Sequence, residues 1–87
     1  MSNNIDNLKK RLIYRSQYRG TKEMDKLIGT FVQTIIRDLN KVQLLDLEKF
    51  LDIDDDTLYK IYNNQLDQTD LFKNKIMELF KKFNYKN

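Results

Sequence analysis

The feature of this sequence that most constrains its fold is the near absence of residues that interrupt helices. Its 87 residues contain no proline and only two glycines, Gly20 and Gly29. Glycine and proline are the strongest local signals for turns, so we expect long helices joined by polar turns. No segment alternates apolar and polar residues with the period of a strand. The sequence therefore predicts an all-α fold.

The spacing of apolar residues predicts five helices, packed as one compact bundle in a single domain that spans residues 1–87. A chain of this length buries only about 60% of its unfolded surface, which allows one thin core and no large substrate cavity. The helices are expected at about 4–18, at about 21–39, from Asn40, from Asp54, and from Thr69 or Asp70. The residues expected in the core are Ile5, Leu8, Leu12, Ile13, Met24, Leu27, Ile28, Phe31, Val32, Ile35, Leu39, Val42, Leu45, Leu47, Phe50, Leu51, Leu58, Ile61, Tyr62, Phe72, Ile76, Leu79, Phe80 and Phe83.

Local signals mark several helix ends. Gly20 follows the first apolar segment, where a residue with positive φ is expected to end the helix. Asn40 and Gln43 have the spacing of a capping box, and Asn64 is suited to a left-handed stop. Gly29 lies inside the second helix, where glycine costs about 1 kcal/mol relative to alanine. We therefore expect close packing of another helix at Gly29.

Composition restricts the chemistry that this chain can perform. The absence of cysteine and histidine removes disulfides, thiolate catalysis, the commonest general base and the commonest metal ligand. No nucleophile–base pair is visible, so the sequence predicts a protein that is not an enzyme and holds no metal. The run Asp54-Asp55-Asp56 lacks the alternate spacing and the glycine of a calcium loop. Capping of a helix N-terminus is the better explanation for these acids.

Charge is distributed unevenly along the chain. Residues 1–22 carry six basic side chains and one acid (+5), residues 23–70 five bases and eleven acids (−6), and residues 71–87 five bases and one acid (+4). This pattern favours a protein partner with its own charge map over a nucleic acid. No apolar run approaches the roughly 20 residues that span a bilayer, and the first residues resemble neither a secretion signal nor a transit peptide. We expect a bacterial cytoplasmic protein, or a mitochondrial matrix protein if the chain is a processed organellar form.

The segment from Arg19 to Glu23 is the strongest candidate for a binding site. Gly20 has no side chain, so a partner backbone can approach it closely. Arg19 carries a forked donor, and Glu23 is expected to carry its carboxylate on the same exposed corner. The same residues also serve a simple turn, with Gly20 ending one helix and Glu23 complementing the dipole of the next.

A nucleic-acid-binding or regulatory helical domain is the alternative function. Tyr14 and Tyr18, with Arg15, Arg19 and neighbouring lysines, have the side chains that stack on bases and neutralise phosphates. The first helix must also bury one face, so some of these tyrosines are expected in the core or at its rim. The acidic middle of the chain leaves only a small basic footprint for a nucleic acid.

The stretch from Arg11 to Phe31 resembles the SdhE family, the small assembly factors that promote covalent flavinylation of the succinate dehydrogenase flavoprotein subunit. Arg19, Gly20 and Glu23 match the family motif Arg-Gly-x-x-Glu, and the flanking residues match as well: Arg15-Ser16, Met24-Asp25 and Leu27-x-Gly29-x-Phe31. The chain departs from the pattern at Thr30, Ile61 and Asn64. Some relatives carry a proline at the first position, many carry a tryptophan at the second, and a glycine is frequent near the third.

The resemblance implies a five-helix bundle and a partner, the flavoprotein subunit of succinate dehydrogenase or fumarate reductase. It implies that Arg19, Gly20 and Glu23 bind this partner, with help from Arg15 and Arg11. FAD would be carried by the partner, whose own histidine would attack the flavin while the helper, monomeric when free, orients the partner's domains. The resemblance implies no cofactor on this chain.

Overall fold

The structure of the protein, a computed structural model, describes residues 3–63, 65 and 75–83. Within these residues it contains five α-helices, one 3₁₀ helix and no strand, which confirms the predicted all-α bundle. None of the helices in the described part is both long and apolar enough to cross a membrane. The elements are α1 (Asn3–Gln17), α2 (Lys22–Ile35), η1 (Ile36–Asp38), α3 (Lys41–Leu51), α4 (Asp55–Tyr62) and α5 (Lys75–Lys82).

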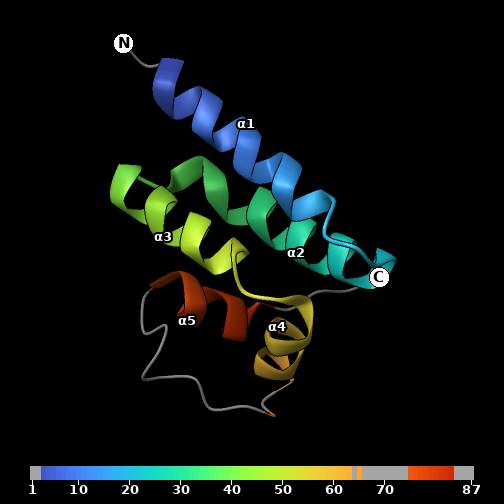
Figure 1. Cartoon of the computed structure of the whole chain (residues 1–87). Coiled ribbons are helices and arrows are strands. Elements are labelled where there is room, and N and C mark those ends of the chain that lie inside the picture. Colours follow the sequence, from blue (N-terminus) through green and yellow to red (C-terminus); the bar gives the residue numbers. More distant parts are fainter. Residues whose placement is uncertain (1–2, 64, 66–74, 84–87) are drawn as a thin grey trace.

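The helices are arranged around a layer formed by α2 and α3. Helix α1 packs across this layer on one side, in contact with both helices (Figure 1). Helices α4 and α5 lie on the opposite side, where α5 packs against both α3 and α4. The turn after α1 and the loop between α3 and α4 consequently lie at the same end of the bundle.

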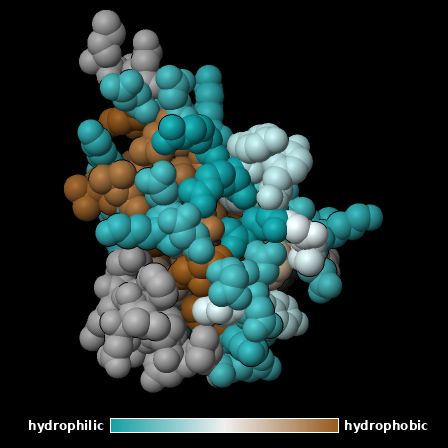
Figure 2. All heavy atoms as spheres, in the orientation of Figure 1, coloured by the Kyte–Doolittle hydropathy of each residue, from teal (hydrophilic) through white to brown (hydrophobic). Residues whose placement is uncertain are grey.

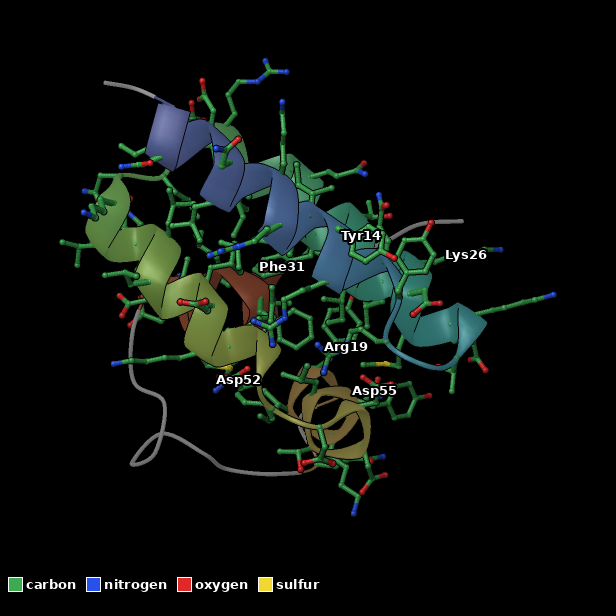
Figure 3. All side chains as sticks on the ribbon, turned by 45° about the horizontal axis from the view of Figure 1, so that its top comes forward. Tyr14, Arg19, Lys26, Phe31, Asp52 and Asp55 are labelled. Atoms are coloured by element: carbon green, nitrogen blue, oxygen red, sulfur yellow. The ribbon has the colours of Figure 1, made fainter. Side chains whose placement is uncertain are left out.

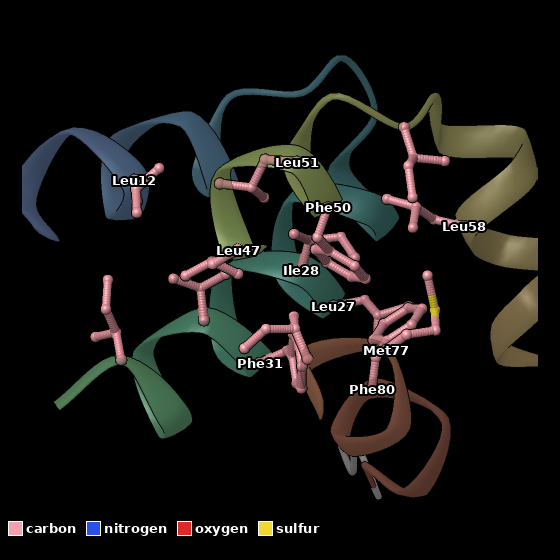
Figure 4. Close-up of a cluster of buried hydrophobic side chains, with 14 of the residues drawn as sticks. Leu12, Leu27, Ile28, Phe31, Leu47, Phe50, Leu51, Leu58, Met77 and Phe80 are labelled. Carbon is pink, nitrogen blue, oxygen red and sulfur yellow. The ribbon is translucent and has the colours of Figure 1, made fainter. Parts of the chain in front are cut away.

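Three phenylalanines from three helices form the centre of the core (Figure 4). The ring centroid of Phe31 in α2 lies 5.6 Å from that of Phe50 in α3 and 5.1 Å from that of Phe80 in α5, and the last two are 5.0 Å apart. The rings are tilted or edge-to-face, the arrangements that aromatic pairs prefer. These contacts tie the layer of α2 and α3 to α5.

The predicted core is wrong at three positions. Ile5 is exposed, and Val42 and Leu45 are exposed over 69% and 44% of their surfaces. Leu44 is buried in their place because the inner stripe of α3 runs along Leu44, Leu47 and Leu51, so its neighbours face outward. Hydrophobic side chains are accordingly visible at the end of the molecule where α1 and α3 begin (Figure 2).

The end of α2 also differs from the predicted single helix over 21–39. The α-helix ends at Ile35 and continues as the 3₁₀ turn η1. The tighter winding of a 3₁₀ helix changes which side chain faces inward. Ile36 is therefore buried, whereas Ile35 is only partly buried.

Both predicted N-terminal caps are confirmed. The side chain of Asn40 accepts a hydrogen bond from the amide of Gln43 (2.9 Å), and the side chain of Gln43 accepts one from the amide of Asn40 (3.0 Å). Asp54 caps α4 by accepting a hydrogen bond from the amide of Thr57 (3.1 Å). The predictions for Asn64, for the helix start at Thr69 or Asp70, and for Phe72 lie outside the described residues.

Gly29 lies at a close contact between α1 and α2, as the sequence predicted. A Cβ atom at this position would lie 3.1 Å from Cγ of Gln17 and 3.7 Å from the carbonyl oxygen of Ser16. Ser16 is itself fully buried and donates a hydrogen bond to the carbonyl of Ile13 (2.6 Å). The missing side chain of Gly29 therefore sets the spacing of the two helices.

Candidate functional site

The α1–α2 turn (residues 18–21) is held in one shape by the start of α2. Gly20 has φ 140°, so the predicted positive φ is confirmed, although α1 ends earlier, at Gln17. The carboxylate of Asp25 accepts hydrogen bonds from the amides of Arg19 (2.6 Å) and Gly20 (3.3 Å). Thr21 caps α2 by accepting a hydrogen bond from the amide of Met24 (3.2 Å). These hydrogen bonds thus fix the backbone conformation of the turn.

The expectation that Arg19 presents an exposed guanidinium is wrong. Its side chain is only 9% exposed and is directed toward the loop between α3 and α4 (Figure 3). Nε donates to a carboxylate oxygen of Asp55 (2.5 Å) and Nη1 to the carbonyl of Leu51 (2.8 Å), while Nη2 donates to the carbonyl of Ile53. Arg19 therefore joins the α1–α2 turn to the loop before α4.

Gly20 and Glu23 remain on the surface, as the sequence predicted for this corner. A Cβ atom on Gly20 would meet only a carboxylate oxygen of Asp55, at 3.8 Å, so the space above this backbone is open. Glu23 is exposed in the first turn of α2. It also borders a groove of about 730 Å³ between α2 and α4, which the sequence did not predict and whose lining includes Lys26 and Tyr59. The corner is accessible to a partner.

Arg11 and Arg15 lie one turn apart on α1. Arg15 forms an exposed ion pair with Asp52, with Nη2 2.6 Å from the carboxylate oxygen. Arg11 is exposed beside the start of α3, where it borders a shallow hollow with Leu45 and Glu48. Both arginines thus lie on the same side of α1, and Arg15 is the nearer of the two to the α1–α2 turn.

Two exposed tyrosines accompany these arginines. Tyr14 and Tyr18 are 64% and 67% exposed, and their ring centroids lie 4.5 Å apart, so neither tyrosine belongs to the core or its rim. On an ideal helix with 3.6 residues per turn, positions 11, 14, 15 and 18 fall within an arc of about 100°. Buried Leu12 lies outside this arc, about 110° from its middle on the same projection, so the helical spacing already separated these four residues from the buried stripe.

The tyrosines face acidic residues, which disfavours the nucleic-acid alternative. A hollow of about 520 Å³ lies beside them, and Asp52, Asp54 and Asp55 contribute to its walls. Carboxylates at this position repel the phosphates that stacked bases would bring with them. The surface is therefore poorly suited to a nucleic acid.

Asp54 acts as a helix cap. The hydroxyl of Thr57 donates to one of its oxygens (2.7 Å) and the amide of Thr57 to the other (3.1 Å). These hydrogen bonds, the one from the hydroxyl first, lower the pKa of Asp54 below its ordinary value of 3.8. No group of three or more candidate ligands within the described ranges could hold a metal ion.

Comparison with known proteins gives a consistent result. The family model described as flavinator of succinate dehydrogenase matches residues 10–84. The mitochondrial succinate dehydrogenase assembly factor 2 of Aspergillus flavus is 36% identical over 55 residues, which is 63% of this chain and 19% of that protein. The Aspergillus terreus protein of the same description is 36% identical over 52 residues, or 60% of this chain and 18% of that protein. No solved structure matches the chain significantly.

The fold and the comparisons together define the class of protein, a small helical assembly factor rather than an enzyme. The chain belongs to the family of flavinators of succinate dehydrogenase, because the family model covers most of its length. The resemblance seen in residues 11–31 is thereby confirmed. The chain spans about a fifth of the length of the curated relatives that it matches.

Proposed function

We propose that this chain binds the flavoprotein subunit of succinate dehydrogenase, or of fumarate reductase, and promotes the covalent attachment of FAD to that subunit. The observation that carries the proposal is the family match over residues 10–84, which includes the α1–α2 turn. FAD belongs to the partner in this proposal, and the chain needs no cofactor of its own. The free protein is proposed to be a monomer.

The proposed contact surface contains Gly20, Glu23, Arg15 and Arg11, with Arg19 beneath it. Gly20 offers an accessible backbone, Glu23 a carboxylate, and the two arginines offer cationic donors along α1. Arg19 contributes by fixing the turn, since its donors are already bound within the chain. Of the three motif residues, Arg19 thus fixes the shape of the turn, whereas Gly20 and Glu23 are exposed for contact with the partner.

The physical basis of the proposed activity is orientation. Holding reacting groups in a near-attack geometry supplies several kcal/mol without any added catalytic group. A rigid docking surface can hold two domains of a flavoprotein in such a geometry, and the α1–α2 turn is rigidly hydrogen-bonded. The covalent bond then forms through the chemistry of the flavoprotein itself.

The compartment is proposed to be that of the flavoprotein. This is the cytoplasm in a bacterium or the mitochondrial matrix for an organellar protein. The two Aspergillus relatives are described as mitochondrial.

Covalent flavin fluorescence of the denatured flavoprotein subunit in a gel tests the proposal. The subunit is incubated with FAD, with and without this protein. We expect wild type to increase covalent flavin, and Glu23→Ala and Gly20→Arg to increase it much less. Glu78→Ala, which removes an exposed carboxylate on α5, is the matched control. Equal flavinylation with and without wild type would refute the function. Full activity of both folded corner variants would refute the site.

A further inference from the structure

We propose that the tyrosine hollow, formed by Tyr14 and Tyr18 together with Asp52 and Asp54, receives an arginine side chain of the flavoprotein subunit. This inference rests on the proposed function for the identity of the partner. It assigns a role to a surface that the motif residues Gly20 and Glu23 do not occupy, and it names the chemistry of the partner at that point.

The first support is the position of the two rings. Tyr14 lies in the last turn of α1, and Tyr18 follows it four residues later as the first residue of the α1–α2 turn, where its ring still lies beside that of Tyr14. The ring planes are tilted by 34° with a centroid distance of 4.5 Å, and both rings are mostly exposed. The core does not require them. A tilted pair of exposed aromatic rings provides negative π faces that bind a cation.

The second support is the charge around the rings. The hollow is lined by three carboxylates, Asp52, Asp54 and Asp55, and by two guanidinium groups, Arg15 and Arg19. Arg15 is paired with Asp52, and Arg19 is bound to Asp55 and to two backbone carbonyls. The charges within the hollow thus leave one negative charge in excess, which complements a cation.

The third support comes from comparing possible occupants. An apolar peptide would bury the carboxylate of Asp54 without bringing a cation to it, which is unfavourable. A phosphate would meet three carboxylates. An arginine fits both features of the hollow, because its planar guanidinium stacks on aromatic rings and donates in a fork to carboxylates. A lysine has the charge but lacks the planar stacking group.

Affinity for the flavoprotein subunit, measured by isothermal titration calorimetry, tests the inference. We expect Tyr14→Ala and Tyr18→Ala each to weaken binding by about tenfold. Tyr14→Phe and Tyr18→Phe keep a π face and should stay within about threefold of wild type. Asp54→Asn keeps the helix cap but removes a charge, and it should weaken binding severalfold. Val42→Ala, at an exposed apolar side chain on α3 that lines neither the hollow nor the groove beside Glu23, is the control.

The outcomes separate this inference from the function on which it rests. If wild type binds the subunit and the folded double variant Tyr14→Ala/Tyr18→Ala binds equally well, the hollow proposal is overturned while the function stands. If wild type does not bind, both are overturned. Self-association of wild type that the double variant abolishes would assign the hollow to a second copy of this chain and would also overturn the proposal.

A probe on the free protein gives an independent readout. Titration with the tripeptide Gly-Arg-Gly, followed by NMR, should shift the ring signals of Tyr14 and Tyr18 more than those of Tyr59. Gly-Lys-Gly should produce smaller shifts. Equal shifts for all three tyrosines with both peptides would contradict selective recognition of arginine.

Discussion

Arg19 and Asp55 are 36 residues apart in the chain and form an ion pair of 2.5 Å between the α1–α2 turn and the first turn of α4. Because Arg19 is 9% exposed and also binds two carbonyls, its removal leaves a half-buried carboxylate and two acceptors without their donor. We expect Arg19→Ala to lower the free energy of unfolding by about 3 kcal/mol in urea titrations followed by circular dichroism.

Arg15→Ala is the natural control for that experiment. Its pair with Asp52 is exposed on both sides, and exposed ion pairs contribute less than about 1 kcal/mol. Arg19→Lys should recover little stability, because an ammonium group cannot reproduce the three-way fork. Equal unfolding midpoints for Arg19→Ala and Arg15→Ala would show that the buried interactions of Arg19 do not stabilise the fold.

Gly29 allows a test of the spacing between α1 and α2. Replacing glycine with alanine in a helix gains about 1 kcal/mol, but the new Cβ lies 3.1 Å from Cγ of Gln17. We expect the two effects to cancel in Gly29→Ala, leaving thermal stability near wild type. When Gln17→Ala is introduced first, the crowding is gone. Gly29→Ala should then stabilise by about 1 kcal/mol. No gain in this second background would contradict the steric explanation.

Acidification should weaken the start of α4. The pKa of Asp54 is lowered, so its ionised form is favoured in the folded state. The resulting stabilisation is complete above the ordinary pKa of 3.8 and is lost as the pH falls through the lower folded value. Urea titrations at several pH values should therefore show a loss that begins near the ordinary pKa. Asp54→Asn should remove this part of the pH dependence while keeping the cap. An unchanged pH profile in Asp54→Asn would show that ionisation of Asp54 does not stabilise the start of α4.

The register of α3 can be tested with two neighbouring leucines. Leu44 is fully buried and Leu45 is exposed. We expect Leu44→Ala to cost about 3 kcal/mol, as for other buried leucines, and Leu45→Ala to cost less than about 1 kcal/mol. Guanidinium unfolding of the two variants measures both values. Similar losses at both positions would place the inner stripe of α3 elsewhere.

Features that depend on neighbouring residues could be predicted from the sequence. The capping box joins Asn40 to Gln43, and the cap of α4 joins Asp54 to Thr57, so both lie within one turn of helix. The positive φ of Gly20 likewise follows from a local requirement of the turn. The close approach at Gly29 was predictable because glycine inside a helix needs a packing reason.

Features that depend on distant residues could not be predicted. The sequence around Arg19 contains no signal for its acceptors, which lie 32 to 36 residues further along the chain. Periodicity alone also left the centre of the α3 stripe uncertain by one residue, since Leu44 and Leu45 are equally apolar. Only packing against α1 and α5 decides which of them faces inward. The acids beside Tyr14 and Tyr18 come from the loop between α3 and α4, so the charge around the two rings could not be predicted from their own segment.

The acceptors of Arg19 have a consequence for how the chain is made. A ribosome delivers residues in order, and domains generally fold as units. Helices α1 and α2 are complete in sequence by Ile35, but the carbonyls and carboxylate that hold Arg19 come from Leu51, Ile53 and Asp55. A chain that is truncated before Leu51 thus contains all the motif residues and the hydrogen bonds of Asp25 to the turn, but it lacks the acceptors that hold the side chain of Arg19. Only a chain that has been synthesised beyond Asp55 can hold the guanidinium of Arg19 in its buried position.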